Sequence, residues 1–161
     1  MNKELLNNEL EFAYPDGFGV MGPEEVKALN TFKEGPGWCI KDPDRHMIIT
    51  VAWKKAGGFT SLLAGTKDVA KSFDSSFKKL MAPYGYVLEG YVEGEIAGRK
   101  YDGIKYHYTA QDIEMYGESL SVKNGKNYYY VHFYARQELR EASDKVMEDI
   151  LTGSSWKYLI R

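Results

Sequence analysis

Residues 116–136, YGESLSVKNGKNYYYVHFYAR, decide the fold because two strand-like runs flank the dipeptide Asn124-Gly125. Asn-Gly favours a two-residue type I′ turn, since both central residues of that turn need a positive φ. A turn centred there places Val122 opposite Asn127. The stretch is therefore predicted to form an antiparallel hairpin.

The alternation of side chains along a strand sorts this hairpin into two faces. One face is mostly apolar and consists of Tyr116, Leu120, Val122, Tyr129, Val131 and Phe133. Glu118 falls on the same face and is its one charged residue. We expect this face to belong to the core. The opposite face of the second strand carries Tyr128, Tyr130, His132 and Tyr134.

The residues after the hairpin, QELREASDKVMEDILTG, repeat apolar side chains with the 3.6-residue period of a helix. The apolar stripe consists of Leu139, Ala142, Val146 and Ile150. We expect this stripe to pack against the sheet. Gly153 is predicted to end the helix, because glycine is common just past a helix C-terminus.

The composition is that of an ordinary globular protein, and 161 residues suffice to bury a core. The 21 basic and 23 acidic side chains leave a net charge of -2, which provides no basic field for nucleic acid. The single cysteine, Cys39, excludes an intramolecular disulfide. No run approaches the ~20 apolar residues of a membrane span, and the first residues do not resemble a signal peptide. We therefore expect a cytoplasmic protein with no membrane span and no nucleic-acid partner.

Short strands and helices alternate along the rest of the chain. Strands are predicted at residues 10–14, 18–21, 38–41, 46–54, 86–96 and 104–109. Strand 46–54 is apolar on both faces, so we expect it to lie centrally with cover on both sides. Two further helices are predicted, one from Pro23 to near Asn30, and one with Thr66 as its N-cap.

This order of elements indicates an α+β fold. We expect residues 1–161 to form one domain, an α/β/α sandwich with a mainly antiparallel sheet of about six strands and three helices. Asp102-Gly103 fits either a hairpin turn or a bulge. The side chains expected to be largely buried are Ile49, Val51, Phe73, Phe77, Leu88, Val131, Phe133, Val146 and Ile150.

Several short stretches, taken in order, resemble the PsbP-like family of α/β/α sandwiches. They are YPDGF (14–18), a central strand that ends in Trp53, IAGRKYDGIKYHY (96–108), GKNYYYVHFYA (125–135) and EDILTGSSW (148–156). That family includes the extrinsic protein of the oxygen-evolving complex, a Ran-binding nuclear import factor and many bacterial proteins of unknown role. It shares no common catalytic signature. The resemblance therefore implies a fold and a non-enzymatic role.

Residue types that often carry chemistry are present, but their spacing matches no known motif. His46, His107 and His132 lie in strand patterns without metal-ligand spacing. No nucleophile motif surrounds Cys39, and no Gly-rich phosphate-binding motif follows a strand. Glu89, Glu93 and Glu95 alternate on a face that we expect to be solvated. We therefore predict no catalytic residue, no cofactor and no metal.

The tyrosine-rich face of the last strand is the most informative feature for function. Tyrosine is over-represented at binding surfaces, although it also suits the packing of a strand beneath a helix. If the face is exposed, Tyr128, Tyr130, His132 and Tyr134 are the expected binding residues. We favour a non-enzymatic binding or scaffold domain with a protein partner, and leave a homodimer open. The alternative is a small-ligand-binding protein or enzyme with a cleft between the Gly-rich loop 55–65 and these strands.

Overall fold

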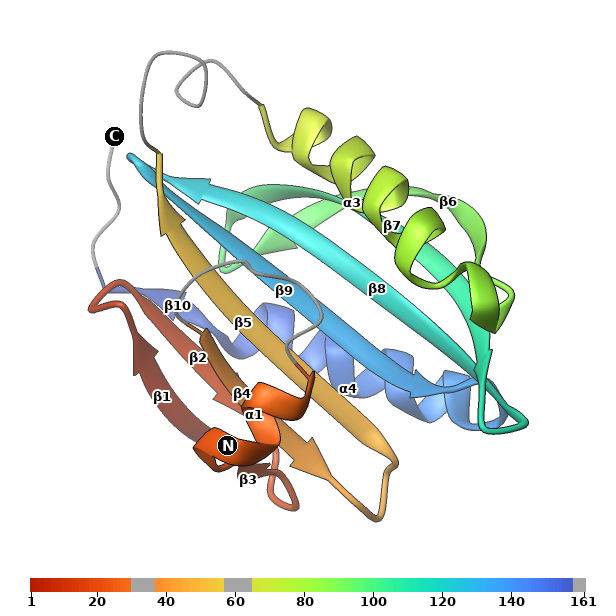
Figure 1. The fold of residues 1–161 in the computed structure, drawn as a ribbon. Helices are drawn as coiled ribbons and strands as arrows, with labels where there is room; N and C mark the ends of the chain where they lie inside the picture. Colours follow the sequence, from red (N-terminus) through yellow and green to blue (C-terminus); the bar gives the residue numbers. More distant parts are fainter. Residues whose placement is uncertain (30–36, 57–64, 158–161) are drawn as a thin grey trace.

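An antiparallel sheet of seven strands forms the middle layer of the described structure (Figure 1). The computed structural model describes residues 1–29, 37–56 and 65–157. The strands are β1 Asn2–Leu6, β2 Leu10–Tyr14, β3 Gly19–Val20, β4 Gly37–Asp42, β5 Met47–Lys55, β6 Val87–Ile96, β7 Arg99–Ala110, β8 Ile113–Asn124, β9 Asn127–Arg136 and β10 Ser155–Trp156. The α-helices are α1 Pro23–Leu29, α3 Thr66–Leu80 and α4 Arg140–Gly153, with short 3₁₀ helices at Ala82–Tyr84 and Gln137–Leu139.

The layers follow from the strand order, which is β3-β4-β5-β9-β8-β7-β6 in the main sheet. Helix α3 covers one face of this sheet, whereas α4 and a small sheet of order β1-β2-β10 lie on the other (Figure 1). Each side has its own apolar core: Phe73 and Phe77 of α3 pack on one, and Met147 and Ile150 of α4 on the other. The predicted α+β class, with three helices on a mainly antiparallel sheet, is confirmed for the described residues. The main sheet has seven strands, close to the six expected.

The hairpin of β8 and β9 is confirmed, but its turn lies one residue later than predicted. Asn124 pairs with Asn127, so the turn residues are Gly125 and Lys126. Gly125 has a φ of 62° and takes the first central position, which a type II′ turn reserves for glycine. Val122 therefore lies opposite Tyr129 instead of Asn127. The register is displaced by two residues, an even number, so every side chain keeps its predicted face.

The β6-β7 hairpin turns at residues 97–98, both of which have a positive φ. Asp102-Gly103 is neither a turn nor a bulge, because both residues pair within β7 with β6 and with β8. The irregularity lies in the neighbouring strand, between Leu88 and Gly90 of β6.

Helix α3 begins one residue earlier than the sequence pattern suggested. Gly65 is the N-cap, and its backbone N–H donates to the Asp68 carboxylate at 3.3 Å. Thr66 is instead the first helical residue. Its hydroxyl donates to Asp102 on β7 at 2.5 Å, which ties the start of the helix to the sheet.

Helix α4 buries a stripe displaced by one residue from the predicted one. Its buried residues are Ser143, Met147 and Ile150, whereas Val146 is partly buried and Ala142 is exposed. Met147 is also apolar and lies next to Val146, so both residues are compatible with the helical period, and it is Met147 that is fully buried.

The end of α4 is set by Ser154 and not by Gly153, which is the last helical residue. The Ser154 hydroxyl donates to the Ile150 carbonyl at 2.7 Å and accepts the Ala13 N–H at 3.0 Å. This side chain therefore joins the helix end to strand β2.

Seven of the nine side chains predicted to be largely buried are buried. They are Ile49, Val51, Phe73, Phe77, Val131, Phe133 and Ile150. Leu88 and Val146 are only partly buried, because Leu88 lies beside the irregularity of β6 and Val146 lies at the margin of the α4 stripe. Strand β5 is interior, between β4 and β9, as its two apolar faces predicted.

The sequence pattern did not predict the two-residue strand β10, nor did it predict strand β1. Four of its five residues are exposed and only Leu6 is buried, so it carries no apolar alternation. It forms because its backbone pairs with β2 over five residue pairs. Within the described residues, no helix combines the length and the apolar character that a membrane span requires.

Candidate functional site: the outer edge of strand β6

The tyrosine face of β9 does not meet the condition of exposure on which its predicted binding role depended. Tyr128, Tyr130 and His132 are buried, and Tyr134 is partly buried. Phe73 of α3 makes edge-to-face contacts with this face, at 5.7 Å from the Tyr130 ring and 5.2 Å from the His132 ring. A binding role for these residues needed exposure, which the helix α3 removes.

A buried hydrogen-bond network explains why a histidine is tolerated beneath α3. The His132 Nδ1 atom lies 2.7 Å from the Ser119 Oγ atom, which lies 2.9 Å from the Tyr106 hydroxyl. Burial raises the pKa of Tyr106 well above its ordinary value, so the phenol stays neutral. These buried polar groups satisfy one another and stabilise the α3 side of the core.

The other candidate residues of the sequence lie apart from one another. His46 adopts a φ of 53° just before β5, and His107 on β7 faces Glu89. Cys39 is buried, and burial raises the pKa of its thiol, which disfavours the reactive thiolate. Among residues 1–29, 37–56 and 65–157, no three His, Cys, Asp or Glu side chains gather as metal ligands would. The cleft of the alternative function falls mostly on residues 57–64, outside the described residues.

Exposed apolar side chains concentrate between the end of α3 and the first half of β6, the last strand of the main sheet. The described chain has seven exposed large hydrophobic side chains, and four of them lie between residues 80 and 91. We call these four the edge patch: Leu80, Tyr84, Val87 and Tyr91, at 41 %, 51 %, 48 % and 54 % exposure. Tyr91 pairs with Ile104 and lies on the α3 side of the sheet, whereas Val87 pairs with His107 and lies on the α4 side, so these two flank the strand from opposite faces. In the described part of the chain, β6 pairs with β7 alone, so its outer edge is free of a neighbouring strand. An exposed apolar group along an unpaired strand is typical of an interaction surface.

The irregularity of β6 divides the glutamate row that the sequence pattern had placed on one solvated face. The pairing of β6 with β7 shifts at Glu89, as in a β-bulge, between Leu88 and Gly90. As a result, Glu89 points to the α4 side of the sheet, where it meets Arg140. Glu93 and Glu95 point to the α3 side and remain exposed, as predicted.

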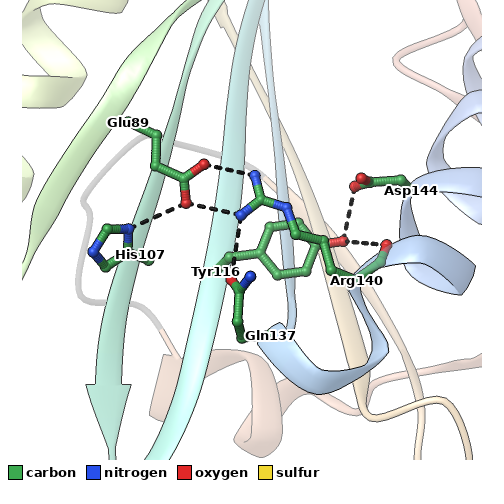
Figure 2. A network of polar contacts seen from close by, with 6 residues as sticks. All are labelled: Glu89, His107, Tyr116, Gln137, Arg140 and Asp144. Carbon is green, nitrogen blue, oxygen red and sulfur yellow. Dashed lines mark hydrogen bonds and ion pairs between the residues drawn. The ribbon is translucent and has the colours of Figure 1, made fainter.

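Glu89 and Arg140 form a bidentate ion pair that fixes the bulge to the first turn of α4 (Figure 2). The two guanidinium nitrogens of Arg140 donate to the Glu89 carboxylate at 2.6 and 2.9 Å. The His107 Nδ1 atom lies 3.2 Å from the same carboxylate, and Arg140 also donates to Gln137 at 3.2 Å. The hydrogen bonds from Arg140 hold the pKa of Glu89 below its usual range, with a smaller contribution from His107.

The ring of Tyr116 packs against the Arg140 side of this ion pair. The guanidinium carbon of Arg140 lies 4.4 Å from the Tyr116 ring centroid, a cation–π contact, and the Tyr116 hydroxyl donates to Asp144 at 2.9 Å (Figure 2). Arg140 is thus oriented by Glu89, Gln137 and the ring at once. The network joins β6, β8 and α4, and its charged groups are directed at one another. It positions the edge strand, and we assign it no catalytic role.

Glu118 is a buried carboxyl on the α4 side of β8, with only 7 % exposure. Burial raises its pKa, and the nearby Asp144 adds to the rise, whereas Lys105 and Arg140 oppose it. A carboxyl with a raised folded-state pKa contributes stability that is fully present below its unfolded pKa. That stability is lost as the pH rises through the folded pKa.

We therefore expect Glu118→Gln to raise the free energy of unfolding at pH 7 by about 1–3 kcal/mol, because it removes a buried charge. The gain should vanish near pH 4, where the carboxyl of the natural protein is neutral. Urea titrations at both pH values measure this difference. Glu114→Gln, on the same face of β8 but exposed, is the matched control with no expected effect. An equal effect of Glu118→Gln at both pH values would contradict the assignment.

Comparisons with known proteins find the fold and no close relative. No family model matches the chain, and no curated protein matches its sequence. The solved structure of cyanobacterial PsbP (CyanoP) from Synechocystis has a TM-score of 0.71 at 12% identity, and the match covers 96% of this chain and 91% of that one. LpqN of Mycobacterium tuberculosis, involved in cell envelope biogenesis, has a TM-score of 0.61 at 12% identity, with 91% and 82% covered. The Ran-binding protein Mog1p of Saccharomyces cerevisiae has a TM-score of 0.53 at 10% identity, with 99% and 96% covered.

The resemblance that the sequence motifs suggested is therefore confirmed at the level of fold. All three neighbours are below 25% identical to this chain, so they carry no residue roles to it. The chain has the PsbP-like α/β/α sandwich fold, which it shares with CyanoP and Mog1p.

Proposed function

We propose that this chain is a binding domain that recognises a protein partner through the edge patch and catalyses no reaction. The observation that carries the proposal is the concentration of exposed apolar side chains, Leu80, Tyr84, Val87 and Tyr91, in and just before the free edge strand β6. Two tyrosines with exposed rings offer a large contact area at a low cost in side-chain entropy.

Two further observations support a binding role. The charged side chains beside the patch form ion pairs with one another, as Glu89 does with Arg140. They do not converge on an open site where a substrate could bind and react. Mog1p, which has the same fold, is a Ran-binding protein, so this sandwich serves protein recognition in at least one relative by structure. A cytoplasmic location and a single-domain organisation stay predictions from the sequence.

Replacing Tyr84 and Tyr91 together with serine is expected to abolish capture of the partner and to leave the fold intact. Both side chains are more than half exposed, so the free energy of unfolding should change by less than about 1 kcal/mol. The measurement is affinity capture with the tagged chain as bait in lysate of its natural host, with mass spectrometry of the bound proteins.

Val20→Ser is the matched control, because Val20 is equally exposed, at 58 %, but lies in β3 at the opposite edge of the sheet. We expect the control variant to capture the same protein as the natural chain. A protein retained by the double tyrosine variant and lost by Val20→Ser would contradict the proposal.

A further inference from the structure

We propose that the partner binds as an extended basic segment that pairs with β6 and adds an eighth strand to the main sheet. This inference rests on the proposed function and names the chemistry of the partner. It follows from the backbone of β6, the charge of its side chains and the register of its pairing with β7.

The backbone groups of β6 that are free to pair can be assigned from the hairpin register. The two-residue turn at 97–98 makes Ile96 and Arg99 the first hydrogen-bonded pair, and such pairs alternate along an antiparallel ladder. The N–H and C=O groups of Tyr91, Glu93 and Glu95 therefore point away from β7. The pairing is continuous from Gly90 to Ile96, which is long enough for a typical strand to dock.

The same three residues present a defined row of side chains on the α3 side. Tyr91 is apolar and exposed, and Glu93 and Glu95 follow at alternate positions. Strand β6 contains three glutamates and no basic residue. An added strand that places an apolar side chain opposite Tyr91 and basic side chains opposite Glu93 and Glu95 makes favourable cross-strand pairs.

The existing ion pairs leave these glutamates available. Glu93 lies 3.5 Å from Lys67 and 3.9 Å from Lys100, but all three side chains are more than half exposed, so water screens both pairs. Glu95 forms no salt bridge with any residue in the described ranges. Glu89 is already held by Arg140 and is not part of the proposed contact.

A second copy of this chain fits the edge poorly. Antiparallel pairing of two β6 strands around Glu93 and Glu95 places the glutamates of one copy opposite or diagonal to those of the other. Like charges in these positions destabilise a strand pair. The acidic row and the bulge at Glu89 are devices that block self-association of an edge strand. The glutamates do not block a basic strand, because their negative charges attract its positive side chains.

The test uses a fluorescently labelled peptide, Thr-Lys-Thr-Lys-Thr-Leu-Thr, which in antiparallel pairing sets its lysines opposite Glu95 and Glu93 and its leucine opposite Tyr91. Fluorescence anisotropy measures its Kd for the natural chain. We expect binding that weakens as salt is added. N-methylation of the two lysine and the leucine amides should weaken it at least tenfold, because the methyl groups remove the pairing N–H donors. The peptide with glutamate in place of lysine should also bind at least tenfold more weakly.

The charge-reversed variant Glu93→Lys with Glu95→Lys tests the charge contribution. Its expected preference is inverted, with the glutamate peptide bound more tightly than the lysine peptide. Equal binding of the N-methylated peptide, or an unchanged preference in the reversed variant, would overturn strand addition.

Failure of all peptides to bind would overturn strand addition as well. It would leave binding through the edge patch standing if the Tyr84 and Tyr91 variant still loses its partner. A dimer of the natural chain in sedimentation equilibrium that Glu93→Lys strengthens would assign the edge to a second copy and would also overturn it.

Discussion

Replacing Phe77 with alanine is expected to lower the free energy of unfolding by about 3–5 kcal/mol, as for other large-to-small changes of a buried aromatic residue. Phe77 is 1 % exposed and lies at the centre of the core beneath α3. Its ring centroid lies 5.1 Å from that of Tyr106, 5.9 Å from that of Phe73 and 6.0 Å from that of His132. Alanine would leave a cavity between the helix and the sheet, because these rings are held by their own contacts.

Urea titration of the natural chain and the variant measures this cost. Tyr84→Ala is the matched control, because Tyr84 is an aromatic residue just after the same helix but is 51 % exposed, so its loss should cost less than about 1 kcal/mol. A Phe77→Ala cost below about 1 kcal/mol would mean that α3 does not pack on the sheet through this stripe.

Gly103→Ala is expected to lower the free energy of unfolding by about 1–3 kcal/mol, because the added methyl group overpacks the space between two strands. A Cβ atom at Gly103 would lie 2.8 Å from the Leu120 Cδ2 atom and closer still to the backbone carbonyl of Ser119. Because Ser119 belongs to the paired strand β8, the carbonyl can move only if the two strands separate. This close approach is the reason for glycine in the middle of β7.

Gly90→Ala provides the comparison, since Gly90 lies in the adjacent strand β6 and a Cβ atom there would meet no atom within 4 Å. Its expected cost is below about 0.5 kcal/mol. Thermal unfolding of both variants in the same buffer measures the difference. If both variants lose the same free energy of unfolding, the loss at Gly103 comes from strand propensity and not from the close contact with β8.

Local periodicity was sufficient to predict the elements whose side chains face a core. The hairpin, strand β5 and helix α3 each bury one regular set of apolar residues, and the period identifies that set. The position of the hairpin turn was missed because Asn124-Gly125 is a strong turn signal, yet Asn124 is fully buried and stays in the ladder. Strand β1 was missed because only one of its five side chains is buried, so it lacks the apolar alternation that predicts a strand.

The alternation of side chains along a strand was not sufficient to predict which surface of the protein binds a partner. Alternation correctly placed Tyr128, Tyr130 and His132 on one face, but it carries no information about which helix covers that face. The edge position of β6 depends on strand order, which arises from contacts distant in sequence. The bulge at Glu89 had a weak signal in Gly90. The exposure of Tyr91 did follow from alternation, because Tyr91 shares its period with Glu93 and Glu95, but alternation does not show that the strand lies at an edge.

The central claim is that a protein partner covers the edge patch, and a photo-crosslinking amino acid at position 91 tests it most directly. With the crosslinker in place of Tyr91, irradiation of living cells should join the chain covalently to the protein that the bait captures. The same amino acid in place of Val20, which is equally exposed at the far edge of the sheet, should give no such product. A product at position 20 together with none at position 91 would contradict the account.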